Sequence, residues 1–336
     1  MFIVDNYTMA VVLCFLTMLC WGSWGNTQKL AAKSWRYELY YWDYVIGMVI
    51  VAFLIGITFG SFGSEGRHFF ADLAQADWNN IGSVILGGII FNASNILLSA
   101  SVSLAGMSVA FPLGVGLALV LGVIINYIGA PKGDPVWLTI GVTLVVIAII
   151  CNGIASARVS KSGEESKNNR KGIVLAIVAG VLMSFFYRFV AAGMDLDDFA
   201  HPASGMMTPY SALFIFSIGV LLSNFVFNTY VMRKPFTGTP VKYSEYFKGS
   251  LGTHLTGMFG GLIWTVGTCS SYVAAGVAGA AISYALGQGA PMIAALWGVF
   301  IWKEFKGADK KTDWLLAVMF VFFIAGLASI IKSGAN

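Results

Sequence analysis

Two stretches of this 336-residue chain, AGMSVAFPLGVG at 105–116 and AGAAISYALGQG at 278–289, carry the same pattern of glycines. In each stretch an Ala-Gly pair is followed, six residues later, by Leu-Gly-x-Gly. An offset of 173 residues carries Gly106 onto Gly279 without any gap. The chain is therefore predicted to contain two copies of one unit. The same offset aligns aromatic with aromatic and polar with polar in the flanks: Phe91 with Trp264, Asn92 with Thr265, Asn95 with Thr268, and Phe111 with Tyr284.

The composition is that of an integral membrane protein. Mean hydropathy is +0.78 and charged residues make up only 11% of the chain, against about 25% in soluble domains. Roughly 20 apolar residues cross the hydrocarbon core as one helix. The predicted fold is thus an all-α polytopic membrane protein with ten transmembrane helices, five in each copy. The ten apolar runs are 9–30, 42–60, 80–104, 108–129, 135–157, 172–192, 207–232, 251–275, 279–302 and 313–332.

Basic residues fall mostly on one side of these helices. Every Lys and Arg lies in or beside a connection that follows an odd-numbered helix, except Arg67, Lys132, Arg188 and Lys332. The positive-inside rule places that side in the cytoplasm and both termini outside. Because each copy has an odd number of helices, the second copy enters the membrane from the opposite face, and the two repeats are predicted to be inverted.

The predicted organisation is a first five-helix repeat at 1–157, a cytoplasmic linker at 158–171 and a second five-helix repeat at 172–336. Only a few residues around Gly106 join the third and fourth helices, and only a few around Gly279 join the eighth and ninth. Two tight helical hairpins are expected there. A duplicated apolar unit with polar side chains at matched depth is typical of transporters built from internal repeats.

Several classes of function find no support. The linker contains no phosphate-binding G-x-x-x-x-G-K-[ST] loop, which argues against ATP-driven pumping. The four cysteines lie in apolar runs without metal-ligand spacing, so we expect no metal site, no cofactor and no catalytic centre. The net charge of +4 comes from the basic loops, and no nucleic-acid partner is expected. The N-terminal run lacks a basic leader and a cleavage site, so we expect it to be a retained helix.

A set of motifs, in chain order, resembles those of the ureide permease family. That family belongs to the drug/metabolite transporter superfamily, beside the bacterial glucose/ribose and rhamnose porters, and the resemblance covers nearly the whole chain. The motifs are Trp21-Gly22-Ser23-Trp24, Tyr41-Trp42-Asp43-Tyr44, Gly87-Gly88 to Asn95, Gly106-Met107-Ser108-Val109, Asn126-Tyr127, and Pro291 to Trp297-Gly298 followed by Glu304.

The resemblance implies ten helices in two inverted five-helix repeats. It also implies secondary transport of small neutral polar solutes such as ureides, nucleobases or sugars, often driven by protons. Plant members carry a long central loop with a nucleotide-binding-like motif. This chain lacks that loop, so regulation through it is not carried over.

Polar side chains at mid-membrane depth are costly and are often functional. Asn92 and Asn95 lie near the centre of the third helix, three residues apart on one face. The repeat sets them against Trp264, Thr265 and Thr268 at the centre of the eighth helix, and an inverted two-fold axis would bring both centres around one cavity. The two asparagines, Trp264 and Thr268 are predicted substrate-binding residues, because amides can recognise hydroxyls, amides and ureas. The alternative is interhelical hydrogen bonding that only holds the bundle together.

The first helix places Trp21, Trp24 and Gln28 on one face, with Asn26 nearby. Indole faces and amide edges together make a predicted binding wall for a sugar or a flat ring. The alternative is that the two tryptophans face lipid or the protein core.

The ninth helix sets Tyr284 and Gln288 four residues apart, before Pro291, where a bend would expose backbone groups to a cavity. Gln288 overlays Val115, and such a departure from symmetry suits specificity, with a structural amide as the alternative. Arg188 in the sixth helix either clamps a carbonyl or carboxylate of the solute or snorkels to the outer interface. Tyr284, Gln288 and Arg188 complete the predicted substrate-binding residues.

Acidic residues are absent from 79–131 and from 246–303, which span both predicted hairpins. An exporter of cationic drugs would be expected to bury a carboxylate there. The absence therefore favours neutral solutes and weakens the case for proton coupling. Asp43, at the predicted cytoplasmic start of the second helix, is the leading proton-coupling candidate, with helix capping as the alternative. His254 is a second titratable candidate.

The predicted function is secondary active uptake of a small neutral polar solute by alternating access, with protons as the expected coupling ion and another ion as the alternative. An exporter of drugs and metabolites with broad specificity is the alternative. A membrane enzyme or sensor has no nucleophile–base pair or soluble domain to support it. We expect the chain in the plasma membrane, the inner membrane of a bacterium. We expect a monomer, since the fused repeats already form a pseudo-dimer, and dimerisation through lipid-facing surfaces is left open.

Overall fold

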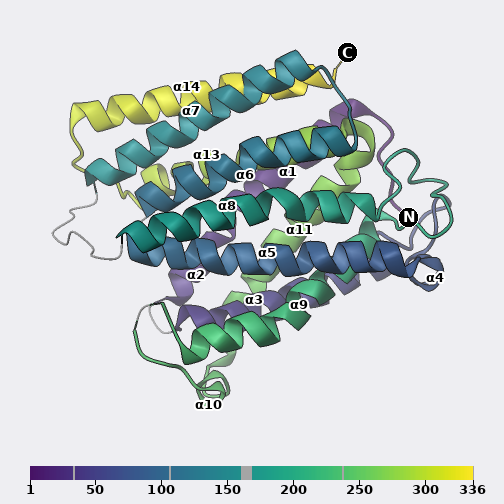
Figure 1. Cartoon of the computed structure of the whole chain (residues 1–336), viewed down its shortest axis with the longest axis horizontal. Helices are drawn as coiled ribbons and strands as arrows, with labels where there is room; N and C mark the ends of the chain where they lie inside the picture. Colours follow the sequence, from purple (N-terminus) through teal and green to yellow (C-terminus); the bar gives the residue numbers. More distant parts are fainter. Residues whose placement is uncertain (33–34, 106, 160–168, 237, 336) are drawn as a thin grey trace.

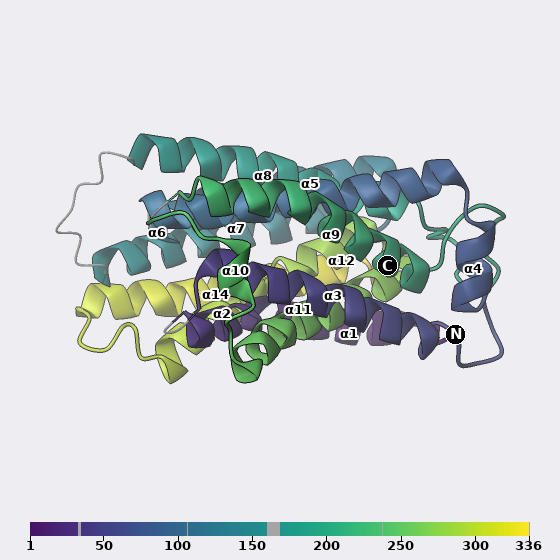
Figure 2. The same cartoon turned by 90° about the horizontal axis from the view of Figure 1, so that it is seen from below.

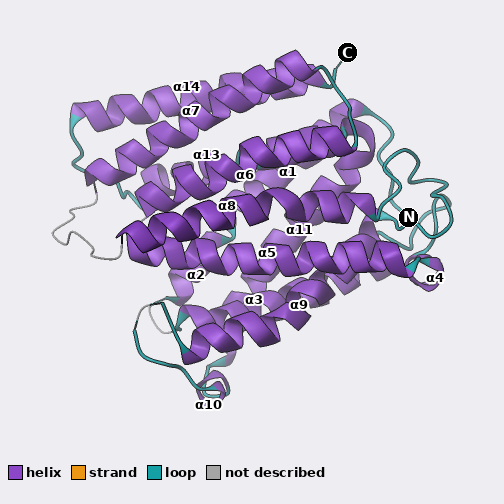
Figure 3. Cartoon of the chain, viewed as in Figure 1, coloured by secondary structure: helices purple, strands orange, loops and turns teal. Residues whose placement is uncertain are grey.

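The computed structural model describes residues 1–32, 35–105, 107–159, 169–236 and 238–335. Within these residues the protein is all-helical, and its one β-type pairing is an isolated bridge between Met194 and Met207 (Figure 3). A backbone in lipid must satisfy its hydrogen bonds internally, and apolar runs of this length do so as helices. The predicted turn at Gly106, the side chain of Phe111 and most of the 158–171 linker lie outside the described part of the chain.

The helices follow one another along the chain with short connections. In order, they are α1 (Tyr7–Ser23), α2 (Gly25–Ala31), α3 (Tyr37–Ile57), α4 (Phe69–Gln75), α5 (Trp78–Ala105), α6 (Met107–Gly129), α7 (Pro135–Val159), α8 (Asn169–Ala192), α9 (Pro209–Arg233), α10 (Tyr243–Tyr246), α11 (Leu251–Ala278), α12 (Ala280–Gly287), α13 (Ala290–Leu296), the π-helix η1 (Trp297–Ile301) and α14 (Lys310–Ser333).

Nine helical stretches among the described residues are long and apolar enough to cross a membrane. They correspond to nine of the ten predicted runs, and the remaining run, in α6, contributes the shorter apolar segment Leu113–Gly129. Two of the nine are interrupted. The first consists of α1 and α2, which are separated at Trp24 although one helix was predicted. The other consists of α12, α13 and η1, and its break at Gln288 and Gly289 comes just before Pro291, where a bend was predicted.

Two helix pairs form opposite edges of the bundle (Figure 1). α7 packs against α14 at one edge, and α3 packs against α9 at the other. Between these edges, α5 packs against α8 and α9, whereas α11 packs against α1 and α3. Both chain ends lie at one end of the bundle with α4, and α10 lies toward the other end (Figure 2). We call this second end the basic end, because its connections carry Lys29, Arg36, Lys234, Lys242, Lys248, Lys303 and Lys306.

Two helix crossings depend on glycine. Gly88 of α5 lies directly against the backbone carbonyl of Phe216 on α9. Gly261 of α11 lies in the same way against the backbone carbonyl of Tyr44 on α3. A Cβ atom at either glycine would collide with the facing carbonyl oxygen, so a larger residue would force the two helices apart.

The hairpin between α11 and α12 also requires glycine. Gly279 is the single residue between the two helices, and its φ of 86° lies in the left-handed region that glycine adopts without strain. The tight turn predicted around Gly279 is therefore confirmed.

Gly88→Ala is expected to lower the melting temperature of the purified protein in detergent. The added methyl group must displace α9, and overpacking of this kind costs about 1–3 kcal/mol. Gly82→Ala, on the same helix, is the matched control, because nothing lies within 4 Å of a Cβ atom there. Equal melting temperatures for the two variants would contradict the assignment of Gly88 to a close helix crossing.

Candidate functional site

A network of amides and hydroxyls joins three helices near the middle of the bundle. The Tyr41 hydroxyl on α3 donates to Asn92 Oδ1 on α5 (2.9 Å) and accepts from Asn95 Nδ2 (3.1 Å). Asn92 Nδ2 donates in turn to Ser223 Oγ on α9 (2.9 Å) and to the carbonyl of Val220 (3.3 Å). All four side chains are buried. We call Tyr41, Asn92, Asn95 and Ser223 the amide network, in which the two predicted asparagines meet on one tyrosine.

A group of aromatic rings lies beside the amide network. Trp264 of α11 stacks on Trp21 of α1, with ring centroids 6.1 Å apart, and on Phe216 of α9, at 5.8 Å. Phe91 of α5 packs against the same indole at 4.6 Å. Trp21 Nε1 also donates to Thr268 Oγ1 (3.0 Å). We call Trp21, Phe91, Phe216 and Trp264 the aromatic block, and it brings together both helix centres that the repeat had aligned.

Hydroxyl groups lie beyond the aromatic block along α11. The Tyr187 hydroxyl on α8 lies 2.9 Å from Ser271 Oγ, which lies 2.9 Å from Ser283 Oγ on α12. The ring of Tyr284 packs against Tyr187 at 5.4 Å, and its hydroxyl donates to the carbonyl of Ala118 on α6 (3.2 Å). We call Tyr187, Ser271 and Ser283 the hydroxyl network. Hydrogen-bonding groups therefore lie on both sides of the aromatic block.

The carboxylate of Asp43 is fully buried toward the basic end. Its Oδ2 accepts from Trp35 Nε1 (2.9 Å), and its Oδ1 accepts from the Tyr246 hydroxyl (2.5 Å) and lies 2.7 Å from His254 Nδ1. Burial and the neighbouring carboxylate raise the pKa of Tyr246, which lies outside the spans, so its phenol stays protonated and donates. We call Trp35, Asp43, Tyr246 and His254 the carboxylate cluster.

The position of Asp43 differs from the prediction. Helix α3 begins at Tyr37, so Asp43 lies inside the helix and not at its start. Its oxygens bind side chains from a preceding turn, from α10 and from α11, and the helix-capping alternative is wrong. Asp43 and His254, the two residues that the sequence analysis named as candidates for proton coupling, are therefore in direct contact.

Some predicted residues lie toward the ends of the bundle. At the basic end, Asn26 Oδ1 accepts from Trp302 Nε1 (2.6 Å), and Gln28 is half-buried on α2. At the other end, Arg188 lies against Gly129 at the last turn of α6. The structure does not join these three predicted residues to the amide network.

Two other predicted residues lie nearer the centre. Trp24, at the break between α1 and α2, packs its indole against the ring of Tyr44 at 5.0 Å, beside the amide network. Gln288 ends α12, one turn after Tyr284, and only 9% of it is exposed. Both side chains are therefore placed next to the networks that the central residues form.

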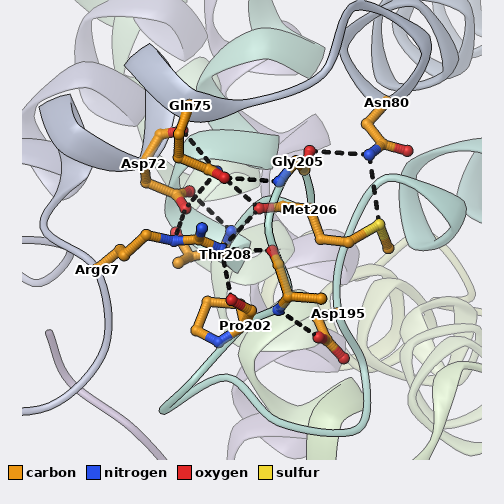
Figure 4. Close-up of polar contacts among 10 residues, drawn as sticks. Arg67, Asp72, Gln75, Asn80, Asp195, Pro202, Gly205, Met206 and Thr208 are labelled. Atoms are coloured by element: carbon orange, nitrogen blue, oxygen red, sulfur yellow. Dashed lines mark hydrogen bonds and ion pairs between the residues drawn. The ribbon is translucent and has the colours of Figure 1, made fainter.

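Arg67 connects α4 to the segment before α9 at the end of the bundle that holds both termini (Figure 4). Its Nε lies 3.1 Å from Asp72 Oδ1 on α4, and its guanidinium donates to the carbonyls of Pro202 (2.9 Å) and Met206 (3.0 Å). The fully buried Asp72 also accepts from the amide of Thr208 (2.8 Å). Arg67 and Asp72 therefore connect the two halves of the chain at this end. The carboxylate cluster connects the same two halves toward the basic end.

Several members of these networks were not predicted. They are Tyr41, Ser223, Tyr187, Ser271, Ser283, Trp35 and Tyr246. For Tyr41 the sequence held a signal, since Tyr37, Tyr41 and Tyr44 follow spacings of four and three on one face of a helix. The serines carried none, because small hydroxyls occur throughout the apolar runs.

The centre of the bundle is built from uncharged polar and aromatic side chains. Among the described residues, no group of three His, Cys, Asp or Glu side chains could hold a metal ion. The side chains at the centre are amides, hydroxyls and indoles, which donate and accept hydrogen bonds without carrying charge.

Comparisons with known proteins agree with this picture. The profile of the ureide permease family matches residues 40–169 and 160–333. Ureide permease 1 and ureide permease 2 of Arabidopsis thaliana are 21% and 22% identical, each over 100% of both chains. The glucose uptake protein GlcU of Bacillus subtilis (strain 168) is 26% identical over 75% of this chain and 79% of its own length.

A solved structure described as "Crystal structure of protein" has the same fold, with a TM-score of 0.57 and 15% identity over 96% of each chain. The relatives are named as permeases and uptake proteins, not as enzymes. Because the family profile matches almost the entire chain, the protein belongs to the ureide permease family of multi-pass membrane transporters.

Proposed function

We propose that this protein is a secondary active transporter that takes up a small neutral polar solute. The observation that carries the proposal is the order of groups along the bundle: amide network, aromatic block, hydroxyl network. A solute that leaves water needs hydrogen-bonding partners at each step, and flat rings offer it an apolar wall. Relatives named for ureides and for glucose support a solute class of ureides, nucleobases or sugars.

The proposed binding residues fall into a centre and two entrances. The centre comprises Trp21, Trp24, Asn92, Asn95, Trp264, Thr268, Tyr284 and Gln288. Asn26 and Gln28 would meet the solute at the basic end, and Arg188 would meet it at the opposite end.

Alternating access of two inverted repeats, 1–157 and 172–336 joined by a linker at 158–171, is the proposed mechanism. The glycine crossings support it. Gly88 faces the backbone of Phe216 and Val220, and Gly261 faces that of Tyr44 and Met48. Each crossing therefore maps onto the other, with an offset of 173 residues for the glycines and 172 for their partners. The glycine of each proposed repeat thus faces equivalent positions of the other repeat.

Helix pairing follows the same correspondence. The pair α5 and α8 maps onto α11 and α1, and the pair α6 and α7 maps onto α12 and α14. The pairs α3 with α9 and α7 with α14 map onto themselves. This supports a bundle of ten helices with a two-fold axis between the repeats, in which one fused chain supplies both halves and acts as a monomer. The excess of basic residues supports a cytoplasmic basic end with both termini outside.

Proton coupling is assigned to the carboxylate cluster. Asp43 and His254 are titratable, lie 2.7 Å apart and belong to α3 and α11, which come from different proposed repeats. Movement of one repeat against the other would separate the two groups and change which of them holds the proton.

Uptake into proteoliposomes tests the function. With an inward proton gradient, labelled allantoin, uracil or glucose is expected to accumulate above its outside concentration, and collapse of the gradient is expected to abolish accumulation. Protein-free liposomes are the control. Failure of every solute in both uptake and counterflow would contradict the proposal and favour the exporter.

Asp43→Asn is expected to separate coupling from binding. Solute exchange between equal pools should persist, because the amide network is unchanged, whereas accumulation driven by the proton gradient should be lost. Asp72→Asn is the matched control, since Asp72 is an equally buried carboxylate at the opposite end. Gradient-driven accumulation by Asp43→Asn at the wild-type level would contradict the assigned role.

Trp264→Ala is expected to lower kcat/KM for uptake by about tenfold or more, because the indole contacts three other rings of the aromatic block. Trp314→Ala is the control, because Trp314 is 69% exposed on α14. If both variants transport as the wild type does, the aromatic block takes no part in recognition.

A further inference from the structure

Asn224 of α9 has an unusual environment for an amide. It is fully buried, and neither its Oδ1 nor its Nδ2 has a hydrogen-bond partner among the residues that the structure describes. Burying a carboxamide without partners is strongly disfavoured, and buried side-chain amides are nearly always paired. Asn92 follows that rule with both of its amide atoms. An amide whose two polar atoms find no partner among the described residues is free to bind a partner that is not part of the bundle.

Two neighbours fix where this amide lies. Ser223, the preceding residue, accepts from Asn92 on α5, and Asn228, one turn later on the same face, donates to the carbonyl of Glu38 on α3 (2.8 Å). α9 is therefore bonded to α5 at Ser223 and to α3 at Asn228, and Asn224 lies along the helix between these two contacts.

Other buried polar atoms on these helices also lack a hydrogen-bond partner among the described residues. They include Asn228 Oδ1 on α9, the Tyr44 hydroxyl on α3 and Thr265 Oγ1 on α11, and all three side chains are fully buried. The ring of Tyr44 packs against Trp24 and against Tyr41 of the amide network. Because α3 packs against both α9 and α11, the three unpaired groups come from helices in mutual contact.

The repeat shows that packing does not demand an amide at this position. The offset that carries Tyr44 onto Phe216 carries Ala52 onto Asn224. Ala52 is fully buried on α3, so a methyl group suffices in the other copy. The amide on α9 is therefore an addition to a position where the fold accepts alanine.

We propose that Asn224 is a solute-binding residue. Its Nδ2 donates to the solute and its Oδ1 accepts from it, which suits a neutral molecule with a donor and an acceptor on adjacent atoms, such as an amide edge or a vicinal diol. The unpaired hydroxyls of Tyr44 and Thr265 supply further partners from α3 and α11. This inference rests on the proposed transport function and adds a site that the sequence patterns did not indicate.

The test compares Asn224→Leu with Asn92→Leu, since both changes replace a buried amide by an apolar side chain of the same branched shape. KM for uptake of allantoin, uracil and glucose is measured in proteoliposomes, and melting temperature is measured in detergent with and without each solute. Asn224→Leu is expected to raise KM about tenfold, to keep or raise the melting temperature without solute, and to abolish its rise on adding solute. Asn92→Leu is expected to lower the solute-free melting temperature, because it leaves Tyr41 and Ser223 unpaired.

Ser329→Ala is the control for unchanged transport, because Ser329 is half-buried on α14 and donates to the carbonyl of Ala325 on its own helix. Asn224→Ala, which copies Ala52, gives the same comparison if the leucine variant does not fold. An unchanged KM would overturn the inference. So would a solute-free melting temperature that falls as far as that of Asn92→Leu, because the amide would then be structural. Absence of transport by the wild type would instead reject the proposed function.

Discussion

Backbone contact at Gly88 and Gly261 is the constraint on which the centre of this protein depends. The carbonyl of Phe216 touches Gly88 while its ring stacks on Trp264. The carbonyl of Tyr44 touches Gly261 while its ring packs against Trp24. Each crossing therefore fixes the height and direction of an aromatic side chain at the centre. A bundle spread by larger residues would lose the crossings and, with them, the placement of the rings.

The distribution of polarity follows from the cost of charge in lipid. Paired carboxylates lie toward the two ends, Asp43 with His254 and Asp72 with Arg67. Between them the chain uses amides and hydroxyls, which can be satisfied in an apolar interior by single hydrogen bonds. A centre of this kind does not carry the desolvation cost of a buried charge.

Sequence alone predicted the elements whose signal is periodic or repeated. Nine of the ten predicted spans, the Gly279 turn, the shared face of Asn92 and Asn95, and the approach of the centres of α5 and α11 all follow from apolar runs and the offset between the two similar stretches. The partners of Asp43 did not, because Trp35 and Tyr246 lie on short segments whose docking depends on tertiary packing. The break at Trp24 also had no signal, since no proline marks it.

Differences between the two copies are the best guide to function in such a protein. Matched residues, such as Gly88 and Gly261, serve a scaffold that both copies need, and their role is explained by packing. Unmatched residues have no such explanation: Asp43 corresponds to Ile215, and Asn224 corresponds to Ala52. One copy therefore carries the carboxylate and the other the free amide. Under the proposed function this division is expected, because a scaffold of two similar copies that binds an asymmetric solute and couples it to a proton cannot share either task equally between the copies.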